Sequence, residues 1–141
     1  MRPAQPGDAR AIAELIARCD ERPPSEGQVR RRLDDRAAWT RMAEGERAAL
    51  GVVSWRQVDG AARLSWLFVD PSERGSGLAG ELLHAAVVAM REAGHSEAEL
   101  WVNDGNEGAR DFYARHGWQP GADRRSDERL GQRLVRYCRA L

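Results

Sequence analysis

The sequence predicts one domain of the α+β class, a mixed α/β sheet, and three observations lead to this prediction. The chain has 141 residues, of which 42% are hydrophobic and 31% charged, as expected for one globular domain. Two segments with helical periodicity come first, and three strand-like segments separated by turns follow them. The remainder alternates strands with helices, which favours a sheet with helices packed on it across residues 1–141.

The first two helices are predicted from apolar spacing and from capping residues. In residues 8–19, Asp8 is suited to the N-cap position and the apolar side chains repeat on one buried face. That face consists of Ile12, Leu15, Ile16 and Cys19. Ser25 and Gln28 have the spacing of a capping box, which predicts a second, short helix that ends near Asp35.

Three strands are predicted between residues 37 and 70. A turn at residues 44–47 and the Asp59–Gly60 pair separate them, and the second of these turns is a strong hairpin signal. Side chains of a regular strand alternate between the two faces of a sheet. In the third strand this alternation predicts one face with Leu64, Trp66 and Phe68 and another with Ser65, Leu67 and Val69.

The second half is predicted to contain two helices and three strands. In chain order these are a helix over 77–93 closed by Gly94, a buried strand over 98–102, a helix over 106–116 stopped by Gly117, and strands around Trp118 and over 133–140.

Composition argues against several kinds of partner. The 22 basic residues balance the 22 acidic ones, so we expect neither a nucleic-acid nor a membrane binder. All the basic residues are arginine, which excludes lysine chemistry. We interpret Cys19 and Cys138 as buried thiols, and expect no metal site. No apolar run reaches the roughly eighteen residues of a membrane span, and the first ten residues lack a signal-peptide core, so we expect a cytoplasmic protein.

The segment RGSGLAGELL, residues 74–83, is the most informative stretch. Gly75, Gly77 and Gly80 have the G-x-G-x-x-G spacing of dinucleotide-binding proteins, but the surrounding chain lacks the βα units of that fold. A phosphate-binding P-loop is excluded because it requires a lysine. A purely structural turn needs fewer glycines. Unpaired N–H groups at the start of a helix favour an anion, so we interpret the loop as a phosphate site.

Two motifs resemble those of the GNAT family of acetyl-CoA-dependent N-acetyltransferases. Arg74, Gly77 and Ala79 match its R/Q-x-x-G-x-G/A signature after a strand that ends in Val-Asp-Pro. Residues 106–118 resemble its N-x-x-A-x-x-x-Y-x-x-x-G-[FW] helix, with Asn106, Ala109, Tyr113, Gly117 and Trp118 in place. The resemblance implies a mostly antiparallel sheet of six to seven strands, about four flanking helices, and a splay between strands 4 and 5.

The same resemblance implies acetyl-CoA as co-substrate. Its pyrophosphate is expected on the loop amides, with Arg74 as the countercharge, and its pantetheine arm in the splay beside Phe68 and Val69. The residues expected to bind it are Phe68, Val69, Arg74, Gly75, Ser76, Gly77, Leu78, Ala79, Gly80, Asn106, Ala109 and Phe112. Tyr113 is expected to be the general acid that protonates the departing thiolate.

The sequence departs from the family pattern at the general base. Many relatives have a carboxylate on the strand before the glycine loop, whereas that strand here reads RLSWLFV. The possible substitutes are Asp20, Glu21, Glu44 and Glu46, or a water file that includes Ser65.

The predicted function is acetyl transfer to a primary amine of a small molecule or peptide. One alternative is a non-catalytic acyl-CoA-binding module or sensor, which the missing carboxylate motivates. The other is a nicotinamide-dependent oxidoreductase, which only the glycine spacing suggests. The sequence leaves the acceptor open, and a homodimer is possible in this family.

Overall fold

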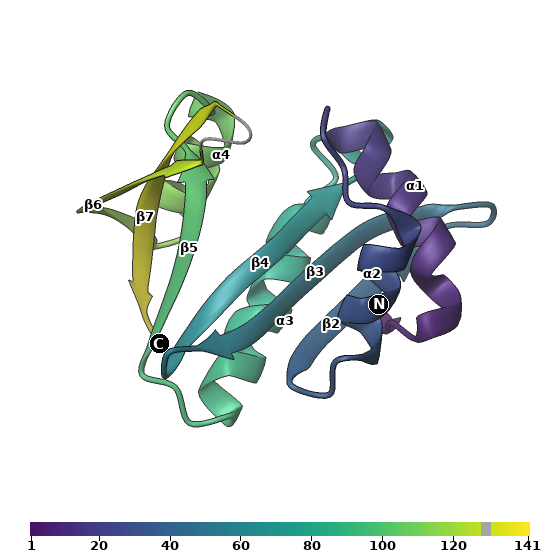
Figure 1. The fold of residues 1–141 in the computed structure, drawn as a ribbon, viewed down its shortest axis with the longest axis horizontal. Helices are drawn as coiled ribbons and strands as arrows, with labels where there is room; N and C mark the ends of the chain where they lie inside the picture. The colour runs from purple at the N-terminus through teal and green to yellow at the C-terminus, as the bar shows by residue number, and fades with distance from the viewer. Residues whose placement is uncertain (128–130) are drawn as a thin grey trace.

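A computed structural model describes residues 1–127 and 131–141 and contains a twisted sheet with helices on both faces (Figure 1). The strands of the described residues are β1 (Arg2–Pro3), β2 (Ala38–Glu44), β3 (Ala49–Val58), β4 (Ala61–Val69), β5 (Glu97–Asn103), β6 (Gln119–Asp127) and β7 (Gln132–Ala140). The helices are α1 (Ala9–Cys19), α2 (Glu26–Asp34), α3 (Leu78–Glu92) and α4 (Glu107–Arg115), with short 3-10 turns at Pro6–Asp8 and Pro71–Glu73. The predicted mixed α+β class is confirmed.

The strands lie in the order β1-β2-β3-β4-β5-β7-β6, and only the β4–β5 pair is parallel among the described strands. That parallel ladder is short, because it pairs Ala62 with Ala98 and Arg63 with Glu99 and no residue beyond. The two strands then diverge towards their C-terminal ends (Figure 1). The expected splay between strands 4 and 5 is therefore present in the sheet.

Helices cover the two faces of the sheet unequally. On one face α1 and α2 bury a cluster with Ile12, Leu15, Ile16 and Val29 against β2 and β3. On the other face α3 packs on β3, β4 and β5, where Leu82, Leu83 and Met90 are buried. Figure 1 shows α1 and α2 in front of β2 and β3, whereas β5, β7 and β6 have no helix in front of them.

The predicted alternation of side chains along β4 is wrong at its midpoint. Ser54 of β3 pairs with Trp66 and Trp55 pairs with Leu64, so Ser65 is an extra residue in β4. Such a β-bulge turns the side chains after it to the opposite faces. Leu64 consequently packs with the α3 cluster, and Trp66 with the α1–α2 cluster.

The two cysteines and one cap also differ from expectation. Cys19 is exposed and Cys138 is partly buried, so neither is the buried thiol that was predicted. Cys19 is the last residue of α1, and its thiol contacts the Val69 carbonyl of β4 at 3.3 Å but stays exposed. Asp8 makes no side-chain cap of α1, because its carboxylate instead binds Arg2 at 2.7 Å and the Gln5 N–H at 2.8 Å.

Other local predictions are confirmed. Ser25 and Gln28 form the reciprocal capping box of α2. At the β3–β4 hairpin, Asp59 and Gly60 both have positive φ, of 51° and 83°, as a tight two-residue turn requires. Among the described residues, no helix is both long and apolar enough to span a bilayer.

Candidate active site

The glycine loop lies between the C-terminal end of β4 and the first turn of α3. Asp70 ends the strand and its carboxylate accepts the Ser72 N–H at 2.9 Å. Gly75 and Gly77 then adopt left-handed conformations, with φ of 80° and 86°. Because a side chain at such a φ is strained, glycine is the residue that lets the chain turn into α3 here.

The start of α3 leaves backbone N–H groups for a ligand. The Ser76 hydroxyl accepts the Leu78 N–H at 3.2 Å, and the Gly77 carbonyl accepts the N–H of Glu81. The amides of Ala79 and Gly80, in the first turn, have no partner among the described residues. Together with the helix dipole, these groups form a site for an anion.

A pocket of about 520 Å³ opens at this loop. It is lined by Val69, Asp70, Glu73, Arg74, Gly75, Gly77, Leu78, Ala79, Gly80, Phe112, Arg115 and His116. Eight residues predicted to bind the coenzyme are among them, from β4, the loop, the first turn of α3 and α4. Ser76, Ala109 and Tyr113 do not line it, although Ala109 and Tyr113 pack against the same core.

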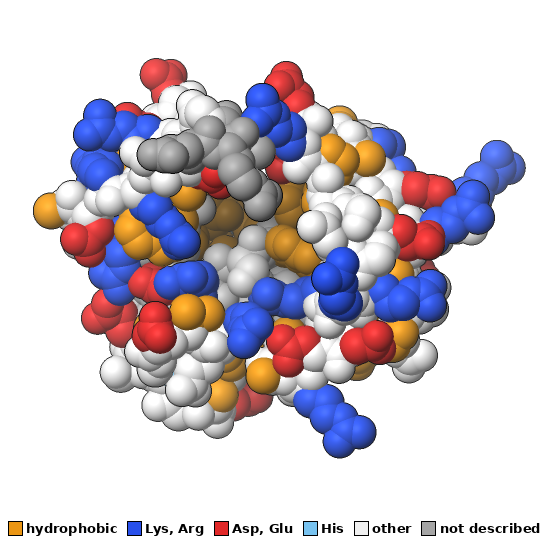
Figure 2. Space-filling model, in the orientation of Figure 1, with side chains coloured by type: hydrophobic (Ala, Val, Ile, Leu, Met, Phe, Trp, Pro, Cys, Tyr) orange, Lys and Arg blue, Asp and Glu red, His pale blue; other side chains and the backbone are white. Residues whose placement is uncertain are grey.

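A second pocket, of about 700 Å³, lies where the ends of β4 and β5 have separated. It is lined by Cys19, Asp20, Glu21, Arg22, Phe68, Asn103, Gly105, Asn106 and Gln132. The two remaining predicted residues, Phe68 and Asn106, are therefore placed here rather than at the glycine loop. Figure 2 shows the hollow between β4 and β5, with hydrophobic side chains in its depth and arginines along its lower rim.

Asn106 caps helix α4. Its side-chain oxygen accepts the Ala109 N–H at 3.1 Å, which fixes the start of the helix. Asn106 is thus a capping residue, whereas its expected contact with the coenzyme stays a prediction. Tyr113 lies seven positions further along, in the same helix.

Tyr113 is largely enclosed by the core beside the glycine loop. Its ring lies edge-on to Phe112, with centroids 5.4 Å apart, and to Trp118 at 6.1 Å. Burial raises the pKa of Tyr113 to about 12. Its hydroxyl has no hydrogen-bond partner among the described residues, so the protonated phenol is free to donate.

Two residues at the glycine loop were missed from the sequence. Arg115 and His116 line the same pocket as Arg74. The His116 Nδ1 lies 2.7 Å from the Phe112 carbonyl, and its Nε2 would be 3.3 Å from a Cβ at Gly80. The sequence did contain a signal for these two residues, because positions 112, 115 and 116 lie on one face of a helix and Phe112 was already expected to bind the coenzyme.

The carboxylates considered as substitutes for the missing base fall into two groups. Glu44 forms an ion pair with Arg2 at 2.9 Å, and Glu46 lies in the turn after β2. Asp20 and Glu21 follow α1 and line the second pocket beside Phe68. The structure thus brings only the second group next to the splay. Ser65 is exposed at the bulge.

No group of histidine, cysteine or acidic side chains is arranged to hold a metal ion in the described parts of the chain.

The amino-acid sequence is similar to those of two curated N-acetyltransferases. It is 34% identical over 127 residues to the mycothiol acetyltransferase of Clavibacter sepedonicus, covering 82% of this chain and 41% of that protein. It is 38% identical over 58 residues to an uncharacterised N-acetyltransferase of Methanocaldococcus jannaschii, covering 41% of this chain and 26% of that one. The chain thus spans less than half the length of either relative.

The fold is shared with solved acetyltransferase structures. The ribosomal-protein-S18-alanine N-acetyltransferase of Escherichia coli superimposes with a TM-score of 0.84 at 18% identity, covering 98% of this chain and 90% of that one. Spermidine N-acetyltransferase of Vibrio cholerae gives a TM-score of 0.77 at 19% identity, covering 99% and 93%. At these identities the likeness concerns the fold.

The model of the acetyltransferase (GNAT) family matches residues 9–118, which include the glycine loop and helix α4. The family predicted from the sequence is confirmed. The chain belongs to the acetyltransferase (GNAT) family.

Proposed function

We propose that this protein transfers the acetyl group of acetyl-CoA to a primary amine of a small molecule or peptide, with Tyr113 as the general acid. The observation that carries the proposal is the pocket at the start of α3, where the glycine loop, Arg74 and helix α4 meet. The splay beside it gives the rest of the coenzyme a path through the sheet.

The phosphates of the coenzyme are proposed to bind at the glycine loop. The N–H groups of Ala79 and Gly80 would donate to the pyrophosphate, and Arg74 would supply positive charge. Arg115 and His116 lie on the opposite wall of the same pocket and would contribute further donors. An adenosine diphosphate end would thus be held between α3 and α4.

The pantetheine arm is proposed to lie along β4 beyond the bulge. From Ser65 onwards β4 has no ladder partner on the β5 side, so its backbone groups there are available to an extended ligand. Phe68 and Val69 lie at this edge. The Cys19 thiol, 3.3 Å from the Val69 carbonyl, makes a weak hydrogen bond that a pantetheine amide could replace.

The proposed reaction is a direct attack. The amine nitrogen forms a bond to the thioester carbonyl carbon, and the carbonyl oxygen becomes an oxyanion that a β4 N–H could stabilise. As the tetrahedral intermediate collapses, the carbon–sulfur bond breaks and the thiolate takes the proton of the Tyr113 hydroxyl. The pKa of Tyr113, about 12, keeps that proton in place until the thiolate forms.

The amine must lose a proton before or during its attack. Asp20 and Glu21 line the pocket beside Phe68 and would take that proton directly or through water. Ser65, exposed at the bulge of β4, would be one link in such a chain of water. A homodimer and a cytoplasmic location stay predictions from the sequence.

Calorimetric titration with acetyl-CoA tests the proposal, with the nicotinamide dinucleotide as the control. We expect micromolar affinity for acetyl-CoA and none for the dinucleotide, followed by thiol release in a screen of amines. Binding without thiol release would favour the non-catalytic module. The absence of acetyl-CoA binding would remove the transferase proposal.

A further inference from the structure

We infer that the acceptor is an amine with a free carboxylate, namely an amino acid, and that Arg32 binds its carboxylate. The inference rests on the proposed acetyl transfer and concerns the side of β4 that faces α1 and α2. It arises from an arginine that the fold holds rigidly, partly buried and without a countercharge among the described residues.

Arg32 reaches from α2 across β3 to β4. Its Nε donates to the Ser54 hydroxyl at 3.0 Å, and that hydroxyl also lies 2.9 Å from the Thr40 hydroxyl. The guanidinium carbon is 5.5 Å from the centre of the Trp66 ring, a cation–π distance. These contacts fix the side chain on the sheet, so the loss of freedom on binding a ligand would be small.

The charge of Arg32 is not balanced locally. Its Nη2 is buried without a hydrogen-bond partner, and no carboxylate among the described residues forms an ion pair with it. Burial and the neighbouring Arg56 lower the pKa of Arg32. A desolvated guanidinium without a partner is costly, and a bound carboxylate would remove that cost.

The neighbouring charges are already paired. Arg56 binds Asp35 at 3.3 Å, and the buried Glu99 accepts bonds from Arg63 at 2.9 Å and from Arg136 at 2.6 Å. In register, Arg56 of β3 lies opposite Arg63 of β4. Asp35, the carboxylate whose charge acts on Arg32, is therefore already paired with Arg56.

The position suits an acceptor. Trp66, below the Arg32 guanidinium, and Phe68, in the pocket with Asp20 and Glu21, are two residues apart on the same face of β4. Two residues of a strand span roughly 7 Å. An amino acid bound between these two residues would direct its amine towards Phe68 and its carboxylate towards Arg32.

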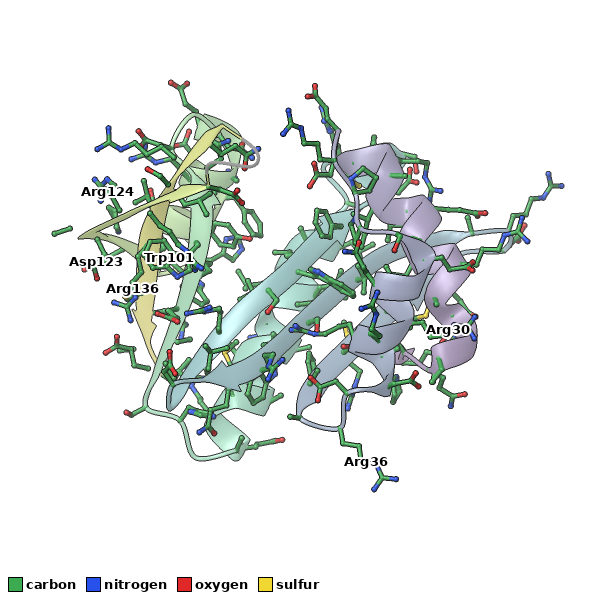
Figure 3. The ribbon with its side chains drawn as sticks, in the orientation of Figure 1. Arg30, Arg36, Trp101, Asp123, Arg124 and Arg136 are labelled. Carbon is green, nitrogen blue, oxygen red and sulfur yellow. The ribbon has the colours of Figure 1, made fainter. Side chains whose placement is uncertain are left out.

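The hollow of Figure 2 opens on this face, and Trp101 and Arg136 lie on its β5–β7 side in Figure 3. Arg30, two residues before Arg32 in α2, lies on the other side of that helix, away from β4 (Figure 3). Residues two apart in a helix point about 200° from one another, which makes Arg30 a matched control.

The test compares the twenty amino acids with their carboxamides as acceptors, at one acetyl-CoA concentration, by thiol release. We expect the best amino acid to exceed its own amide in kcat/KM by at least about tenfold. Arg32→Gln should lower kcat/KM for that amino acid roughly ten- to hundredfold, and for the amide less than twofold. Arg30→Gln should leave both values unchanged.

Calorimetry with acetyl-CoA on each variant separates this inference from the proposed function. If acetyl-CoA affinity is unchanged and the amino acid and its amide are used equally well, or neither is used, the carboxylate site is overturned. Coenzyme binding then remains intact. A protein that does not bind acetyl-CoA loses both proposals. If Arg32→Gln fails to fold, Arg32→Lys retains the charge without the planar fork, and a loss of at least about fivefold for the amino acid alone is expected.

Discussion

The two faces of β4 differ in where their residues come from in the sequence. On the face towards α3 and α4, the residues of the loop pocket come from two short segments, 69–80 and 112–116. On the face towards α1 and α2, Arg32 and the side chains around it come from four separate elements, because Arg32 lies on α2 and Ser54, Thr40 and Trp66 lie on three different strands.

This difference explains why a motif reveals one face and not the other. A helix start binds phosphate with its own consecutive amides, so the necessary residues must be contiguous. Binding an acceptor molecule requires side chains that match its shape and charge. A sheet can supply such side chains from any of its strands. Four predictions test whether the two faces also act separately.

The largest effect is expected at Tyr113. Tyr113→Phe should lower kcat by roughly 100- to 10,000-fold and leave the Kd for acetyl-CoA within about twofold, because only proton transfer is lost. With the pKa of Tyr113 at about 12, kcat in the native protein should show no loss from its ionisation below about pH 11.

The control is Tyr137→Phe, which removes a buried hydroxyl that accepts a bond from Arg110 at 3.0 Å. It should retain turnover within about twofold. Equal turnover of Tyr113→Phe and the native protein would exclude Tyr113 as the acid.

The next effect is expected on stability, at Glu99. Burial raises the pKa of Glu99, but hydrogen bonds from Arg136 and Arg63 outweigh it, so the pKa lies below its ordinary value. Glu99→Gln should lower the free energy of unfolding at neutral pH by about 1–3 kcal/mol, since two arginines lose their countercharge.

The lowered pKa of Glu99 also determines how its contribution to stability depends on pH. The contribution of Glu99 is complete above its unfolded-state pKa, about 4.5, and is lost as the pH falls through the lower folded-state value. Urea unfolding of both proteins should therefore show curves that converge in acid. A difference that stays constant below pH 4.5 would contradict this assignment.

At the glycine loop, Gly77→Ala should cost about 1–2 kcal/mol of unfolding free energy, because φ is 86° there. It should also weaken acetyl-CoA binding, since the strain falls on the amides proposed to hold the pyrophosphate. Gly7→Ala is the matched control, with φ outside the left-handed region and no atom within 4 Å of its Cβ. Thermal unfolding and calorimetry measure both quantities.

The smallest effect is expected at Arg74. Arg74→Gln should raise the Kd for acetyl-CoA about tenfold and make it less sensitive to salt, because an exposed countercharge is removed. Arg91→Gln, an exposed arginine in the last turn of the same helix α3, should change neither. An unchanged Kd for Arg74→Gln would assign the countercharge to Arg115 or His116 instead.

Much of the fold could be predicted because its signals are local. The capping box of Ser25 and Gln28, the Asp59–Gly60 turn and the Asn106 cap each depend on residues within four positions. The regular alternation assumed for β4 failed at Ser65, because a bulge depends on how β3 pairs with β4 and leaves no mark in the strand itself.

The sequence by itself determined the family, the glycine loop and the residues of α4 that lie near it, because each depends on short-range spacing. Only the tertiary structure decided which distant groups meet. It placed Asp20 and Glu21 beside Phe68, put Arg115 and His116 opposite Arg74, and left Arg32 without a carboxylate partner among the described residues. The physical reason is that burial and charge pairing are properties of neighbours in space, which strand order and register set.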